Sequence, residues 1–174
     1  CRLSFPDDPS ITSTSHCSMA CPEAAKKMSS DPINHPIEPN AVPIVYAIYT
    51  LRLLMPCWSC EGHVNQLGEL NKPPKIWFYS VSPFYAKLVA QALSAIKYKE
   101  KLHVDWSVKI LPFSQSMFTL TYSIEPDITE GDEKLLSCLQ QDMHTIGTHL
   151  RSYMLRDARK YVANANNSPF SSNA

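Results

Sequence analysis

The segments HVDWSVKI, at residues 103–110, and FTLTYSIE, at residues 118–125, alternate strictly between apolar and polar side chains. A period of two residues is typical of β-strands that have one buried and one solvated face. The short connection between them favours a hairpin, so we expect an antiparallel pair. The side chains expected in the core are those of Val104, Trp106, Val108, Phe118, Leu120 and Tyr122.

A third strand is expected at residues 75–81, which form a run of β-favouring residues with Ile76 and Phe78 on one side. The dipeptide Ser82-Pro83 follows at once. Serine is a favoured helix cap and proline is favoured in the first turn, so this pair predicts the start of a helix. Apolar residues then recur at helical spacing as far as Ile96.

Two more helices are expected, one before these strands and one after them. Residues 41–54 are apolar almost all round, which predicts a helix buried on most faces, capped by Asn40 and ended by Pro56. Their β-branched content leaves a strand as an alternative. Residues 132–162 carry a long apolar stripe interrupted by Gly147, where we expect close backbone packing.

These elements predict one α+β domain at residues 41–163, with a small antiparallel sheet of about four strands packed on two or three helices. Six prolines interrupt residues 1–40, which we expect to form an irregular, proline-rich N-terminal arm ordered against the domain. Residues 164–174 are polar and are expected to form a disordered tail.

The balance of charge limits the classes of partner. The 174-residue chain has 16 basic and 16 acidic residues, whereas nucleic-acid-binding modules usually carry a basic excess. The sequence therefore gives no strong nucleic-acid signal. The longest apolar run, residues 41–55, is too short and too interrupted to cross a membrane. We expect a cytoplasmic protein without a membrane partner, and the biological partner is unknown.

The segment CWSCEGH, at residues 57–63, gathers two thiols, a carboxylate and an imidazole. Cysteines separated by two residues can present both sulfurs to one zinc ion, and His63 extends this into a Cys-x-x-Cys-x-x-His loop. The only other closely spaced cysteines are Cys17 and Cys21 in the arm. The leading prediction is therefore a zinc site that ties the arm to the domain through Cys17, Cys21, Cys57 and Cys60.

Three alternatives to a metal site stay open for this segment. The cysteine pair could exchange disulfides, although the βαβ surroundings of thioredoxin-like proteins are absent. Glu61 and His63 could form a metal-free catalytic loop for a small-molecule or nucleotide-like substrate, with Gly62 allowing close backbone approach. Cys57 and Cys60 could also simply pack in a core. For the protein as a whole, a protein-interaction module whose proline-rich arm docks a partner is a further alternative.

Residues 59–63, with the sequence SCEGH, also support a resemblance. They are similar to the Ser-Cys-x-Gly-basic motif of wybutosine-synthesising tRNA methyltransferases, and they resemble uncharacterised bacterial α+β proteins with a Ser-Cys-Glu-Gly-His motif. The order helix, motif, strand, helix, hairpin is shared as well. The resemblance implies a common fold and a functional loop at Glu61, Gly62 and His63.

The long C-terminal helix offers a second constellation. Cys138, Asp142, Thr145 and His149 fall on one stripe beside its apolar face. The Asp142–His149 pair could bind a metal or position a water, whereas the usual role of such a stripe is to hydrogen-bond a neighbouring sheet or to face solvent.

Overall fold

The computed structural model describes residues 36–111 and 120–166, with side chains as far as Asn164. Most of the expected arm, including Cys17 and Cys21, and the core candidate Phe118 lie outside these residues. None of the described helices combines the length and apolar character needed to cross a lipid bilayer.

The described residues form an α+β domain, as the sequence predicts. Its main sheet has four antiparallel strands in the order β1-β4-β6-β5. Their bounds are Leu54–Cys60 (β1), Lys75–Ser80 (β4), Leu120–Pro126 (β6) and Trp106–Ile110 (β5). A small second sheet pairs β2 (His63–Val64) with β3 (Leu70–Lys72). The helices are α2 (Val42–Leu51), α3 (Pro83–Glu100) and α4 (Glu133–Asn166).

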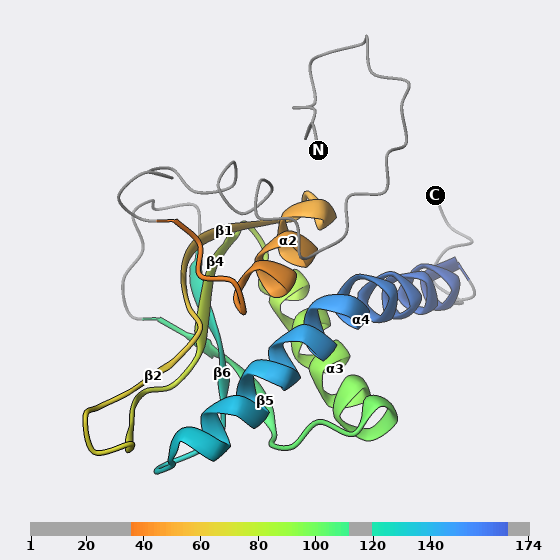
Figure 1. The fold of residues 1–174 in the computed structure, drawn as a ribbon. Helices are drawn as coiled ribbons and strands as arrows, with labels where there is room; N and C mark the ends of the chain where they lie inside the picture. The colour runs from red at the N-terminus through yellow and green to blue at the C-terminus, as the bar shows by residue number, and fades with distance from the viewer. Residues whose placement is uncertain (1–35, 112–119, 167–174) are drawn as a thin grey trace, which may run out of the picture.

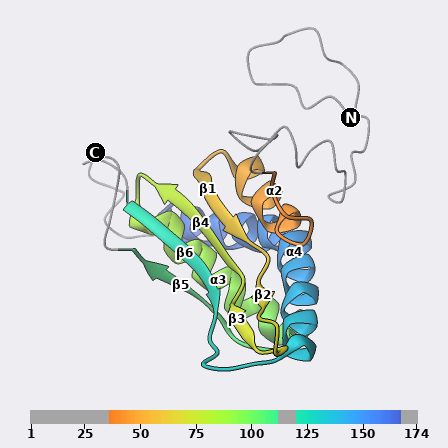
Figure 2. The ribbon, with the colours of Figure 1, turned by 60° about the vertical axis from the view of Figure 1, so that its left-hand side comes forward.

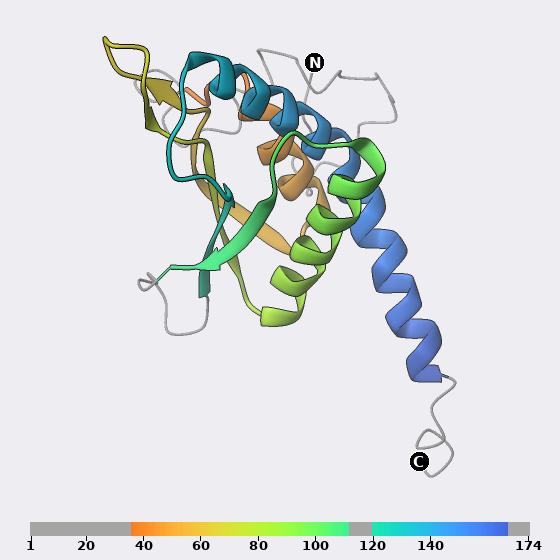
Figure 3. The ribbon, with the colours of Figure 1, turned by 90° about the horizontal axis from the view of Figure 1, so that it is seen from below.

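All three described helices cover the same face of the main sheet (Figures 1 and 2). Seen from below, α3 lies beside the strands, to their right, and α4 runs past it and extends well beyond the sheet (Figure 3). The sheet contributes Ile76, Phe78 and Ile124 to the core, each fully buried. Helix α4 contributes the predicted stripe, of which Leu139, Met143, Ile146, Leu150 and Met154 are buried.

The predicted burial pattern of the hairpin is confirmed at Trp106 and Tyr122 and is wrong at Leu120. Trp106 and Tyr122 are buried, with 6% and 3% of their surface exposed, but Leu120 is 41% exposed. Leu120 stands at the first position of β6, opposite Ser80 at the last position of β4, so it lies at the end of the sheet. Val104 and Val108 are half-buried and pack against the core.

The second face of β6 is not solvated, contrary to the simple alternation rule. Thr121 and Ser123 are both buried, although they alternate with the core residues Tyr122 and Ile124. Strand β6 lies between β4 and β5, and Thr121 and Ser123 are paired with Tyr79 and Trp77 of β4. Large side chains beside small ones shield a central strand on both faces, which periodicity alone does not reveal.

The first helix is shorter than predicted. Arg52 adopts a left-handed conformation with φ of 57° at the C-cap of α2, and its N–H bonds to the carbonyl of Tyr49. Strand β1 then starts at Leu54, where the sequence predicts helix. Pro56 is tolerated in this strand because β1 is an edge strand, where a missing N–H need not break the ladder. Cys57 and Cys60, whose segment the sequence leaves open between a short strand and a tight turn, both lie in this strand.

The expected backbone contact at Gly147 is present. A Cβ atom at this position of α4 would lie 2.4 Å from the carbonyl carbon of Pro43 in α2. The absence of a side chain therefore lets the two helices touch directly. This contact places the N-terminal end of α2 and the residues before it against α4.

Candidate functional site

Cys60 closes β1 at a buried position, and Cys57 occupies an irregular position three residues earlier in the same strand. The ladder between β1 and β4 shifts register between Pro56 and Trp58, so Cys57 lies in a β-bulge. Its exposed thiol is hydrogen-bonded to the side chain of Tyr79. Cys60 is paired with Lys75 at the other end of the ladder. The two thiols thus have different surroundings.

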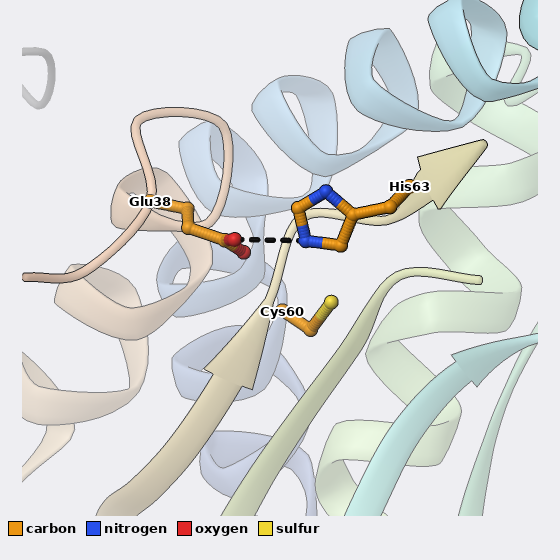
Figure 4. Close-up of side chains that lie close together, drawn as sticks. All are labelled: Glu38, Cys60 and His63. Atoms are coloured by element: carbon orange, nitrogen blue, oxygen red, sulfur yellow. Dashed lines mark ion pairs between the residues drawn. The ribbon is translucent and has the colours of Figure 1, made fainter. Parts of the chain in front are cut away.

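Three potential metal ligands converge where β1 ends. One ligand atom each from Glu38, Cys60 and His63 lies within 4.8 Å of the other two. The Nε2 atom of His63 is 2.9 Å from Oε1 of Glu38. Figure 4 shows the Cys60 sulfur below the edge of the imidazole ring that carries this nitrogen. We call these three residues the Glu38–Cys60–His63 cluster; Cys57 is not a member of it.

The cluster joins two segments that are far apart in sequence. Glu38 belongs to the chain that leads into α2, whereas Cys60 and His63 lie on either side of the turn between β1 and β2. Oε2 of Glu38 accepts a hydrogen bond of 2.7 Å from the backbone N–H of Glu61. Oε2 of Glu61 in turn accepts one of 2.8 Å from the backbone N–H of Asn40. Each carboxylate therefore holds the backbone of the other segment.

Gly62 lets the chain turn between Cys60 and His63. Its φ of +90° is a conformation that L side chains rarely adopt, and a Cβ atom there would lie 2.6 Å from Cδ1 of Leu136 in α4. The Gly62 N–H donates to the Cys60 sulfur over 3.4 Å. The glycine of the Cys-Glu-Gly-His segment is thus needed both for the turn and for its close approach to α4.

Helix α4 supports the site from behind. The side-chain amide of Gln140 donates to the carbonyl of Glu61 over 3.4 Å. One turn further along, Nε2 of His144 lies 3.3 Å from Oδ1 of Asn40. Both segments that carry the cluster are therefore attached to the same core helix.

The cluster is partly open to solvent. The side chains of His63 and Glu38 are 47% and 32% exposed, while Cys60 is buried. The pKa of the Cys60 thiol is raised, chiefly by burial. The negative charges of Glu38 and Glu61 also raise this pKa, while the Gly62 N–H and Lys72 lower it. At neutral pH the thiol is therefore protonated unless a cation replaces the proton. Desolvation also raises the pKa of Cys57. Neither thiol has the lowered pKa that disulfide-exchanging cysteines require.

The residues expected from sequence are only partly brought together. Cys60 and His63 meet in the cluster, but the carboxylate beside His63 is that of Glu38, whereas Glu61 bonds to Asn40. The four-cysteine zinc set stays a prediction, because Cys17 and Cys21 lie outside the described residues. Sequence reasoning missed Glu38, since the Pro-Ile-Glu-Pro stretch at residues 36–39 has no ligand spacing and meets the loop only through the fold.

The second constellation has a structural explanation at Asp142. This carboxylate is 1% exposed and accepts hydrogen bonds from the backbone N–H groups of His103 and Val104 and from Nε1 of Trp106. It also lies 2.7 Å from Nδ1 of His103. His149 is directed instead toward Glu100, at 3.7 Å. Asp142 thus fastens the start of β5 to α4.

Comparisons of the chain with protein-family models, with curated proteins and with solved structures find no match.

Proposed function

We propose that the protein binds zinc through Cys60, His63 and Glu38. The convergence of these three side chains carries the proposal. Thiolate, imidazole and carboxylate are the three protein ligands that zinc uses. The binding would hold the segment before α2 against the turn between β1 and β2, and this role is primarily structural.

The geometry needs little adjustment to receive the ion. Ligand atoms on a tetrahedral zinc lie roughly 3.5 Å apart, given bond lengths of about 2.0 to 2.3 Å. The ligand atoms of the cluster already lie within 4.8 Å of one another, so shifts of about 1 Å suffice. Zinc would replace the Cys60 proton, and its affinity should consequently fall as the pH is lowered.

The arrangement of the cluster favours a metal over a metal-free catalytic triad. In a thiol–imidazole–carboxylate triad the sulfur and the carboxylate contact opposite ring nitrogens. Here the carboxylate contacts Nε2, and the sulfur lies below the same ring edge (Figure 4). Ligands that gather around one nitrogen suit a shared cation. The Glu61 carboxylate, which a Glu61/His63 enzyme would need, is already bonded to the Asn40 N–H.

A fourth ligand is needed to complete a tetrahedral structural site. The sequence prediction assigns Cys17 and Cys21 to this metal, and a thiolate from either would fill the remaining position. Single Cys17→Ser and Cys21→Ser variants test this directly. The variant that loses a sulfur from the zinc coordination shell identifies the fourth ligand, and an unchanged shell in both assigns that position to water.

Cobalt and zinc titrations of the unsubstituted chain and two thiol variants test the proposed site. Cobalt bound by a thiolate gives a sulfur-to-metal charge-transfer absorption, which zinc then abolishes by competition. We expect Cys60→Ser to lose this absorption and to weaken zinc binding strongly. Cys57→Ser is the matched control from the same strand and should bind as the unsubstituted chain does. Equal binding by Cys60→Ser and the unsubstituted chain would refute the proposal.

A further inference from the structure

We infer that Glu61 is a positioning residue of the zinc site, which holds the ligands in place without contacting the metal. The inference rests on the proposed function. It arises from the reciprocal hydrogen bonds between Glu38 and Glu61, in which each carboxylate accepts from a backbone N–H of the opposite segment. We call this pair of bonds the carboxylate clasp.

The clasp determines how Glu38 faces the metal position. Oε2 of Glu38 is held by the Glu61 N–H, which leaves Oε1 directed at His63. A carboxylate held in this way offers the metal a single oxygen. The Asn40 N–H, two residues beyond Glu38, is held by Glu61 in the opposite direction. Glu38 is therefore held at its own carboxylate and, two residues further along its chain, at the Asn40 N–H.

A negative charge at Glu61 also suits the start of α2. The N-cap of this helix is Ala41 rather than the expected Asn40, so no side chain caps it, and its first turn has no acidic residue. The first N–H groups of a helix carry partial positive charge and favour a nearby anion. The Glu61 carboxylate, bonded to the N–H of Asn40 two residues before Val42, supplies that anion from a distant part of the sequence.

Helix α4 fixes the other end of Glu61. The backbone carbonyl of Glu61 accepts a hydrogen bond from the side-chain amide of Gln140, and the adjacent Gly62 packs against Leu136 and Pro74. The Glu61 side chain therefore extends from an anchored backbone, and its loss would free the Glu38 segment rather than the Cys60–His63 turn. Groups that orient metal ligands in this way typically contribute about 10- to 100-fold to metal affinity.

Zinc affinities of Glu61→Ala, Glu61→Gln and Glu69→Ala, measured by competition with a chromophoric chelator beside the unsubstituted chain, test the inference. We expect Glu61→Ala to bind about 10- to 100-fold more weakly. Glu61→Gln keeps an oxygen acceptor for the Asn40 N–H and should recover most of the affinity. Glu69 is exposed in the turn between β2 and β3, where its carboxylate accepts from Asn65, and its alanine variant should match the unsubstituted chain.

The cobalt spectrum at saturation separates positioning from direct ligation. Because Glu61 touches no metal, all variants should reach the spectrum of the unsubstituted chain once enough cobalt is added. A changed saturated spectrum in Glu61→Ala would make Glu61 a ligand and overturn the inference, as would unchanged affinity in that variant. Absence of binding by the unsubstituted chain would overturn the proposed zinc site itself, and the positioning role with it.

Discussion

Replacing Gly147 by alanine tests the direct contact between α2 and α4. The added Cβ would lie 2.4 Å from both the carbonyl carbon and the Cβ of Pro43, and 2.7 Å from its carbonyl oxygen. Two of these atoms are backbone, so no rotamer change relieves the contact and the helices must separate by about 1 Å. Overpacking of this kind costs typically 1 to 3 kcal/mol, and we take about 3 because backbone is obstructed. The better helix propensity of alanine offsets about 1 kcal/mol.

The net loss of about 2 kcal/mol in the free energy of unfolding corresponds to a lowering of Tm by about 4 to 8 °C for a chain of this size. Urea denaturation and calorimetry measure both quantities. Thr148→Ala, at the next and exposed position of α4, is the control and should be neutral or slightly stabilising. A Gly147→Ala variant as stable as the unsubstituted chain, or more stable, would show that helix propensity prevails and that α2 does not press on α4.

Two further predictions concern buried or paired carboxylates. Asp142→Ala leaves the N–H donors of His103, Val104 and Trp106 without their acceptor. In urea denaturation it should lower the free energy of unfolding by at least about 3 kcal/mol, and Asp142→Asn should lower it less. A loss below about 1 kcal/mol in Asp142→Ala would contradict this role. The hydrogen bond from Arg156 holds the pKa of Asp157 below its ordinary value, so its ionised form stabilises the fold above about pH 4, and this contribution is lost as the pH falls. Asp157→Asn should therefore have a lower free energy of unfolding than the unsubstituted chain at pH 7, and the difference should shrink at about pH 3. An equal difference at both pH values would show that ionised Asp157 does not stabilise the fold.

The parts of the fold that depend on local pattern are predictable from the sequence. The alternation in β5 and β6 and the Ser82-Pro83 start of α3 appear where they are expected, and the Ser82 side chain accepts from the Phe84 N–H. The end of α2 is not predictable in this way. An apolar run continues through it to Met55, and the helix ends because Arg52 takes a left-handed conformation that its residue type does not demand.

In the candidate site, too, the local part is predictable from the sequence and the long-range part is not. Cys60 and His63 are found by their spacing, because the turn that brings them together is local and contains the required glycine. Glu38 reaches them only because α2 packs on α4 and β1 pairs with β4, and no spacing rule relates it to them. The bulge that gives Cys57 its own surroundings is also a property of the β1–β4 ladder. Two cysteines separated by two residues do not reveal it.

The proposed zinc site is a mixed set of ligands, made of Cys60, His63 and Glu38. X-ray absorption spectroscopy of the zinc-loaded full chain tests it most directly, because sulfur ligands lie at about 2.3 Å and nitrogen or oxygen ligands at about 2.0 to 2.2 Å. We predict one equivalent of zinc with at least two nitrogen or oxygen ligands and no more than two sulfurs. A shell of four sulfurs would assign the metal to Cys17, Cys21, Cys57 and Cys60 instead, and failure to retain stoichiometric zinc would contradict both assignments.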